Sequence, residues 1–374
     1  MVHPIFLILF FALPSLAALC DTKYTFTSLR SDSKPPSTRI VASGTYSDIK
    51  RYFIRETNYV NDKKITVFKN RDYKPENGKA PEKLSTVAVK ESREPAPEWV
   101  EEQLMDVVMQ ENAIRKKNGQ PKLTQHEIEE IREDVEQRIK EDIHNLFEKE
   151  AENMLALDAL VDTPKEKTRV TPKFKLCGIA NGKKFIMMKH TGLDLKNFFA
   201  NATLDLDETI RAMAKIFKMV YILHSREYAH CDLKPQNITM ELSIKRDMTA
   251  RLVDLQSLTP ADQSCDAMTA RYAAPEVYDH LHAKKQLLRQ SWKAGNGDSK
   301  DKEIIASLPF VDPRKADMYS MGLIGMTLFI PGNDMFGDAN EFLVSNRSDG
   351  SKHMLEAIKT INKKISEFVN KYAH

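Results

Sequence analysis

The chain has 374 residues, of which 41% are hydrophobic and 29% are charged, a globular composition that excludes a disordered, collagen-like or polytopic membrane protein. Lysine and arginine number 56 against 53 aspartates and glutamates, so the formal charge of +3 gives no reason to expect a nucleic-acid partner. Four cysteines, at positions 20, 177, 231 and 265, are too few and too scattered to predict a disulfide framework or a zinc site.

The first twenty residues resemble a secretory signal peptide. They contain no Asp, Glu, Lys or Arg, their apolar run is Ile5 to Leu13, and Ala17 and Ala18 suit signal peptidase. This run is too short to cross a bilayer as a helix, which takes about 20 apolar residues. We expect a cleaved signal at 1–20 and a protein that is secreted or in the secretory pathway, without a stable membrane span. A signal anchor and a cytosolic protein with an apolar N-terminus are the alternatives.

Short strands are predicted in the N-terminal half, after a leader at 21–38 that is rich in Ser, Pro and Lys. Runs rich in β-branched and aromatic residues lie at 39–42, 50–55, 64–68 and 85–90. Two further strand patterns, at 173–177 and 184–188, flank Asn181-Gly182, which is typical of a hairpin turn.

From Thr124 the pattern becomes helical. Thr124 and Glu127 have the spacing of a capping box, and apolar residues follow at steps of three and four. This predicts a long amphipathic helix that packs one stripe on a core, rather than a coiled coil that binds a partner. Helices are also predicted at 207–225 and 318–329, so a β-rich region precedes a helical one. The predicted fold class is α+β, with two lobes and a cleft between them.

Three motifs in the second half carry the chemistry. The stretch from His230 to Asn237 reads His-Cys-Asp-Leu-Lys-Pro-Gln-Asn, Val253-Asp254-Leu255-Gln256 ends an apolar run, and Ala274-Pro275-Glu276 follows. Their order and spacing resemble those of the eukaryotic protein kinase family, and the Lys234-Pro235 pair resembles its Ser/Thr-directed members.

The N-terminal half fits the same resemblance. Val87-Ala-Val-Lys90 is similar to the strand whose lysine holds the nucleotide phosphates, and Glu150 is similar to the helix glutamate that pairs with it. Glu148 and Glu152 are competitors for that role. Residues 42–47 have the layout of the glycine-rich phosphate loop, although only Gly44 of its three glycines is present.

The resemblance implies a bilobal protein kinase-like fold, with a β-rich N-lobe at 39–190 and an α-helical C-lobe at 191–374. A helical insertion would lie in the N-lobe at about 93–145, and a polar insertion would lie in the C-lobe at about 280–308. The implied activity is transfer of the γ-phosphate of ATP, with Mg²⁺, to Ser or Thr hydroxyls of a protein substrate.

Each candidate residue has an implied role. Asp232 and Lys234 would be catalytic, and Asn237 and Asp254 would bind Mg²⁺. The implied ATP-binding residues are Lys90, Glu150, Val41, Gly44, Ile49, Ala88, Met188 and His190. The oligomeric state is not predicted.

The sequence also departs from the family pattern. Gln256 replaces a glycine, Ala42 and Ser47 replace two glycines of the phosphate loop, and Cys231 replaces an arginine that would pair with an activation-segment phosphate. We expect Cys231 to be a small buried residue rather than a reactive thiol. A pseudokinase-type binding or regulatory module, and a kinase-fold enzyme acting on a small molecule or glycan, are therefore alternatives to an active protein kinase.

Overall fold

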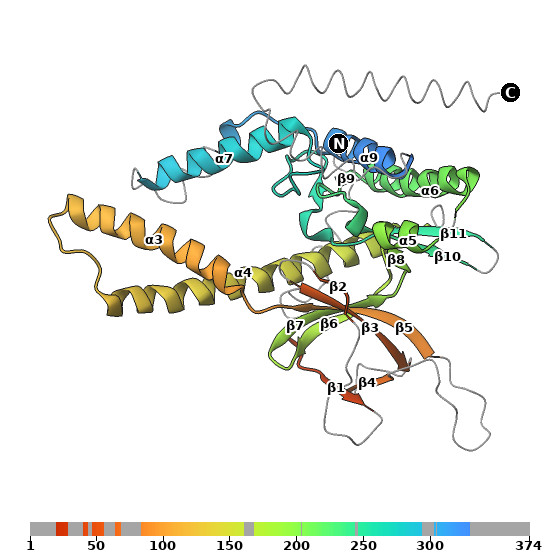
Figure 1. Cartoon of the computed structure of the whole chain (residues 1–374), viewed down its shortest axis with the longest axis horizontal. Coiled ribbons are helices and arrows are strands. Elements are labelled where there is room, and N and C mark those ends of the chain that lie inside the picture. The colour runs from red at the N-terminus through yellow and green to blue at the C-terminus, as the bar shows by residue number, and fades with distance from the viewer. Residues whose placement is uncertain are drawn as a thin grey trace.

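A computed structural model of the chain describes residues 20–28, 40–43, 47–55, 64–68, 84–160, 168–202, 204–243, 246–293, 303 and 305–329. Gly44 and residues 1–19 of the predicted signal peptide lie outside this set. The fold is α+β, as predicted. A twisted sheet forms one part of the molecule and a group of helices forms the other, with one long helix, α4, running between them (Figure 1).

The sheet has seven strands in the order β1-β4-β3-β5-β7-β6, with β2 paired to β3. The strands are β1 Thr25–Ser28, β2 Ile40–Ser43, β3 Ser47–Arg55, β4 Lys64–Phe68, β5 Leu84–Ser92, β6 Phe174–Ala180 and β7 Lys183–Lys189. All six strands predicted from the sequence are present. The seventh, β1, was missed because it lies in the segment predicted to be a leader, where it pairs in parallel with β4.

Strand register places four predicted nucleotide-binding positions on neighbouring strands in two directly paired positions. Ile49 on β3 is opposite Lys90 on β5, and Ala88 on β5 is opposite Met188 on β7. The hairpin between β6 and β7 turns where it was predicted, at Asn181 and Gly182, whose φ angles of 53° and 77° are typical of a tight two-residue turn.

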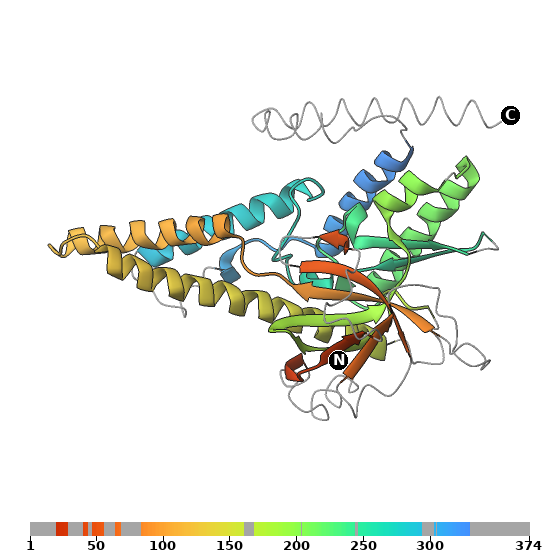
Figure 2. The ribbon, with the colours of Figure 1, turned by 60° about the horizontal axis from the view of Figure 1, so that its bottom comes forward.

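Two long helices, α3 Pro97–Lys117 and α4 Gln125–Ala159, form a hairpin that projects from the sheet (Figure 2). Thr124 and Glu127 form the predicted capping box at the start of α4. The sequence predicted an insertion ending near 145, but α4 continues without a break to Ala159. The helix that carries Glu150 is therefore the same helix that begins at Thr124. The sequence pattern also missed α3 as a separate helix.

The helical region consists of α5 Leu195–Asn201, α6 Leu206–Ser225, α7 Pro275–Lys293 and α9 Pro313–Phe329. Two short sheets accompany it: β8 Leu193–Asp194, β10 Ile238–Leu242 and β11 Met248–Leu252 form one, and β9 Tyr228–Ala229 pairs with β12 Thr259–Pro260 in the other. The first part of the insertion predicted at about 280–308 is helical, because α7 extends to Lys293.

One hydrophobic core joins the two parts. Buried residues of α4, including Ile143, Phe147 and Met154, belong to the same cluster as Leu223 of α6 and Leu252 of β11. Burial of apolar surface on both sides of α4 stabilises its position relative to the helical region. Among the residues that the structure describes, no helix is both long and apolar enough to cross a membrane.

The sequence-based prediction about cysteines is wrong. Cys20 is bonded to Cys177 and Cys231 to Cys265, so all four cysteines are paired. The spacing of the cysteines in the sequence does not indicate these pairs, because each bond joins segments that are distant in the chain and that only the fold brings together. Cleavage of a signal peptide that preserves the first bond must fall before Cys20, rather than after it as the predicted boundary implied.

Candidate active site

Three elements converge on Lys90. Its amino group on β5 lies 2.6 Å from Oε2 of Glu150 on α4 and 2.7 Å from Oδ1 of Asp254, which follows β11. The side chains of Lys90 and Glu150 are 5% and 1% exposed, whereas that of Asp254 is 34% exposed. The ion pair between Lys90 and Glu150 that the sequence predicted is therefore present, and Asp254 is the partly exposed member of the cluster.

Attraction between the opposite charges of this cluster opposes the effect of burial on their pKa values. Burial acts to lower the pKa of Lys90, but the adjacent carboxylates of Asp254 and Glu150 outweigh it, and the net pKa is raised. Burial raises the pKa of Glu150, with Lys90 opposing this effect. Burial also acts to raise the pKa of Asp254, but attraction to Lys90 outweighs it and lowers this pKa. Lys90 therefore stays positively charged and Asp254 stays negatively charged at neutral pH.

The helix register of α4 decides among the three candidate glutamates. Glu150 faces Lys90, while the carboxylate of Glu148 binds Lys184 on β7, and Glu152 is exposed. Residues two positions apart on an α-helix point to nearly opposite sides, so only one of the three can reach Lys90.

The loop from His230 to Asn237 forms the second half of the site. Lys234 Nζ donates to Oδ2 of Asp232 at 2.7 Å, and the amide nitrogen of Asn237 donates to the same oxygen at 3.2 Å and to the Asp232 backbone oxygen at 2.8 Å. Oδ1 of Asp232 is buried and has no hydrogen-bond partner among the described residues. The loop thus fixes one carboxylate oxygen of Asp232 and leaves the other without a hydrogen-bond partner among the described residues.

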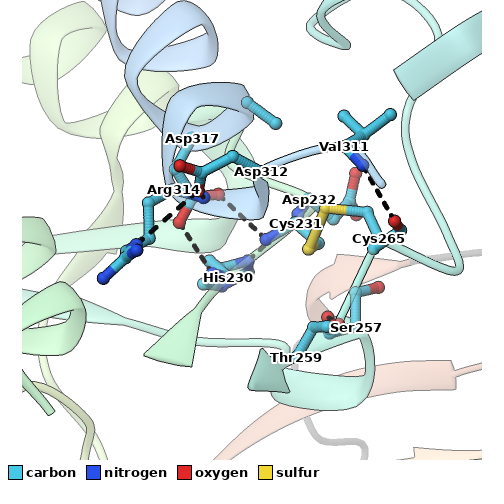
Figure 3. Close-up of a disulfide and its surroundings, with 12 residues drawn as sticks. His230, Cys231, Asp232, Ser257, Thr259, Cys265, Val311, Asp312, Arg314 and Asp317 are labelled. Atoms are coloured by element: carbon cyan, nitrogen blue, oxygen red, sulfur yellow. Dashed lines mark hydrogen bonds and ion pairs between the residues drawn. A yellow bond between two sulfur atoms is a disulfide. The ribbon is translucent and has the colours of Figure 1, made fainter. Parts of the chain in front are cut away.

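Asp317 on α9 binds the backbone at the start of this loop. Its two carboxylate oxygens accept hydrogen bonds from the backbone amides of His230 and Cys231, at 2.7 and 2.9 Å (Figure 3). One of these oxygens also lies 2.9 Å from Nε2 of His224. The ring nitrogen Nε2 of His230 lies 3.0 Å from the backbone oxygen of Val253. These contacts fix the loop relative to the strand end that carries Asp254.

Those predicted nucleotide-binding residues whose side chains the structure describes lie on or next to the neighbouring strands β3, β5 and β7. Ala88 and Met188 are paired across β5 and β7, Ile49 lies opposite Lys90, and His190 follows directly after β7. Val41 lies on β2, but its side chain is outside the described set, as is the whole of Gly44. Burial, with a smaller contribution from Arg51, lowers the pKa of His190 to about 4, so this ring is neutral at pH 7.

The structure adds residues that the sequence did not single out as part of the site. The side-chain amide of Gln256 donates to Oε2 of Glu150 at 3.3 Å, and that of Asn153 donates to the backbone oxygen of Leu255 at 2.7 Å. Both link α4 to the segment after Asp254. Gln256 had been noted only as a missing glycine, and no local pattern indicates its partner.

The ligand chemistry of Asp254 and Asn237 fits Mg²⁺. Both can offer oxygen, which is the ligand atom this ion requires, and the amide nitrogen of Asn237 is already bound to Asp232, which leaves its oxygen for another partner. Val253 N donates to the backbone oxygen of Asn237 at 2.9 Å, so the two ligand residues come from adjacent backbone segments. The described residues include no group of three or more acidic, His or Cys side chains that could hold a metal alone. A Mg²⁺ ion bound here would need phosphate oxygens as further ligands.

Comparison with known proteins shows a weak similarity over part of the chain. No protein-family model matches the chain. Over 170 residues the chain is 25% identical to calcium-dependent protein kinase 4 of Plasmodium falciparum, an alignment that covers 44% of this chain and 26% of that protein. The chain thus spans about a quarter of the length of that relative. Together with the geometry of the site, this similarity indicates a distant and partial relationship to protein kinases.

Proposed function

We propose that this chain is a protein kinase of the secretory pathway, with the bilobal kinase fold, which transfers the γ-phosphoryl group of ATP to Ser or Thr hydroxyls of a protein substrate. The observation that carries the proposal is the ion cluster in which Lys90 binds Glu150 and Asp254 at 2.6 and 2.7 Å. Such a cluster places one fixed cation beside one partly exposed carboxylate that can bind a metal, which is what a nucleoside triphosphate with its metal ion requires.

In this proposal Lys90 binds phosphate oxygens of the nucleotide. Glu150 orients the ammonium group from the buried side, and the aliphatic stretch of β5 and β7 around Ala88 and Met188 accepts the adenine ring. Asp254 and Asn237 hold Mg²⁺ by oxygen atoms. When bound, the ion neutralises negative charge on the phosphate oxygens and favours departure of ADP.

Asp232 acts on the substrate hydroxyl. Its free oxygen Oδ1 accepts the hydroxyl proton as the oxygen of the substrate bonds to the γ-phosphorus and the bond from phosphorus to the β-γ bridging oxygen breaks. Lys234, which lies 2.7 Å from the other oxygen of Asp232, stabilises charge on the transferred phosphoryl group. The products are ADP and the phosphorylated Ser or Thr, with the proton passed to Asp232.

The disulfides support the proposed compartment. Two bonds that use every cysteine of the chain are expected in a protein that folds in an oxidising lumen and are rare in the cytosol. The apolar, uncharged segment at the N-terminus favours the same compartment.

A regulatory nucleotide-binding module without catalysis is the second candidate. It is favoured by Ser47, which stands at a position where the kinase pattern has a glycine, and which is the first residue of β3 with only 7% of its surface exposed. A side chain there limits how closely backbone amides can approach a phosphate. This candidate keeps ATP binding but predicts no phosphoryl transfer.

An activity assay separates the two candidates. The secreted protein is incubated with radiolabelled ATP, Mg²⁺ and a mixture of Ser- and Thr-containing peptides, beside the variants Asp232→Asn and Lys90→Met. For an active kinase we expect transfer by the wild type, at least about 100-fold less by Asp232→Asn, and loss of nucleotide affinity in Lys90→Met. Nucleotide binding by the wild type without any transfer would favour the module.

A further inference from the structure

The disulfide between Cys231 and Cys265 joins the catalytic loop to the segment that leads from Asp254 to α7. The two residues are 34 positions apart, their Cα atoms are 5.6 Å apart, and they are 8% and 1% exposed. They lie in a separate small core with Ala229, Ala274 and Val277. Figure 3 shows this bond directly beside Asp232 and the contacts of Asp317.

The loop end of this bond is fixed by other interactions. Asp317 accepts a hydrogen bond from the Cys231 amide at 2.9 Å, and the backbone of Cys231 has a φ of 63°, in the left-handed region. Asp317 itself is 1% exposed and lies on α9, which packs against α6. Cys231 is therefore held by a contact to Asp317 in addition to the disulfide.

The other end belongs to a segment with little regular structure. Between β12, which ends at Pro260, and α7, which begins at Pro275, the described chain forms no helix or strand. Between its two ends, which are held by hydrogen bonds from the Ala261 amide to the Glu227 backbone oxygen at 2.9 Å and from Ser320 to the Tyr272 backbone oxygen at 2.7 Å, Ser264 accepts from the Val311 amide at 3.0 Å and Asp266 binds Lys284 at 2.6 Å. Exposed ion pairs such as the latter contribute little stability.

This segment also carries a contact to the catalytic loop. Lys234 Nζ donates to Oγ1 of Thr269 at 2.9 Å while it donates to Asp232 at 2.7 Å. The position of Thr269 thus affects the ammonium group that faces the transferred phosphoryl group. Thr269 is four residues after Cys265, so the disulfide limits how far Thr269 can move from Lys234.

We propose that Cys231 and Cys265 are positioning residues for the phosphoryl transfer: their bond holds segment 261–272 on the catalytic loop, with Thr269 against Lys234 and beside Asp232, where the hydroxyl of a substrate peptide would bind. The inference rests on the proposed kinase function. A covalent bond takes the position at which the kinase pattern has an arginine that pairs with an activating phosphate. The segment of this chain is therefore ordered without phosphorylation.

The bond between Cys231 and Cys265 should affect nucleotide affinity and peptide affinity differently. Lys90, Glu150 and Asp254 lie outside the tethered segment, so nucleotide affinity should not depend on the bond. Affinity for the substrate peptide should depend on it. Reduction adds two electrons and two protons to the disulfide, gives two thiols and oxidises a dithiol reagent, after which the segment is free to leave the loop.

The test compares two pairs of substitutions in the full secreted chain. One variant carries Cys231→Ser and Cys265→Ser, and the matched control carries Cys20→Ser and Cys177→Ser, which removes the other bond far from the catalytic loop. For each we measure KM for ATP, KM for peptide, kcat, and the rate of tryptic cleavage after Arg271. Arg271 is the one Lys or Arg between Arg251 and Lys284, so its cleavage reports on this segment alone.

We expect the first variant to keep KM for ATP within about twofold, to raise KM for peptide at least tenfold, and to be cut after Arg271 at least tenfold faster than the wild type. The control should keep both KM values and the cleavage rate, although it unfolds at a lower temperature. If the first variant does not fold, the wild type reduced by a dithiol at 25 °C and alkylated replaces it, with mass spectrometry to identify the opened bond.

Unchanged peptide KM together with an unchanged cleavage rate, once the Cys231–Cys265 bond is absent, would overturn the proposal. The cleavage rate needs no catalytic activity. If the wild type shows no phosphoryl transfer but the segment becomes accessible only without this bond, the kinase function fails and the positioning of the segment stands.

Discussion

The side-chain amide of Gln256 donates a hydrogen bond to the same carboxylate oxygen of Glu150 that binds Lys90. The sequence alone favours a neutral or activating effect of Gln256→Gly, because glycine restores backbone freedom beside the metal site. The hydrogen bond reverses this expectation. Its length of 3.3 Å indicates a modest contribution, on the order of 1 kcal/mol.

We therefore expect Gln256→Gly to lower kcat a few-fold, while Asp254→Asn lowers it on the order of 100-fold or more. Asp254 supplies a full negative charge to the metal, whereas Gln256 only orients Glu150. Initial rates at saturating Mg²⁺ and ATP measure both effects, with Gln256→Glu as a further variant that places two carboxylates together. Equal losses in Asp254→Asn and Gln256→Gly would contradict the assigned metal ligand.

His190 makes stability depend on pH between about 4 and 6.5. Its pKa falls from 6.5 to about 4 on folding because the ring is buried. The unfolded chain then takes up a proton that the folded chain rejects, so the stability present above pH 6.5 is lost as the pH falls toward 4, by at most about 1.4 kcal/mol per pH unit for this group. Urea unfolding at several pH values measures the slope.

The variant His190→Leu should show a smaller slope than the wild type over this range. The matched control is His126→Gln, which replaces a histidine whose side chain is 83% exposed rather than buried. Identical slopes for the wild type and His190→Leu would mean that His190 is protonated in the folded protein.

The bond between Cys20 and Cys177 ties the start of the described chain to the sheet. It joins residues 157 positions apart, and the adjacent backbone adds hydrogen bonds between Tyr24 and Ile179 at 2.8 Å and between Ile179 and Thr22 at 2.9 Å. We expect Cys177→Ser to lower the free energy of unfolding by about 2–5 kcal/mol, measured by calorimetry. N-terminal sequencing of the secreted wild type should give a first residue at or before Cys20. A start after Cys20 would show that the bond does not form in the mature protein.

The sequence has Asn-X-Thr glycosylation patterns that begin at Asn201 and at Asn237, and these two asparagines should behave differently. Asn237 is 3% exposed and its amide nitrogen is bound to Asp232, whereas Asn201 is on the surface at the end of α5. We expect a glycan on Asn201 and none on Asn237 in secreted, active protein, because a sugar on the Asn237 amide would displace Asp232. Mass spectrometry of glycosidase-treated peptides measures occupancy. An active fraction that is fully glycosylated at Asn237 would remove this residue from the proposed metal site.

The sequence by itself determined the local features of this protein. Strand patterns, the Asn181-Gly182 turn and the capping box at Thr124 depend on residues close in the chain, and each was present where it was predicted. The spacing of Asp232 and Asn237 within one loop is equally local, and the structure brings them into contact. These features follow from neighbouring residues whose backbone preferences need no distant partner.

Only the tertiary structure decided which residues meet from distant parts of the chain. Three glutamates of α4 had the same local sequence context, and the packing of the buried stripe of α4 on the core turned Glu150 toward Lys90. The partner of Cys231 could not be inferred either, because it lies 34 positions away in a segment without periodicity. Contacts of this kind depend on how whole elements pack, and packing is determined by the complete core rather than by any local pattern.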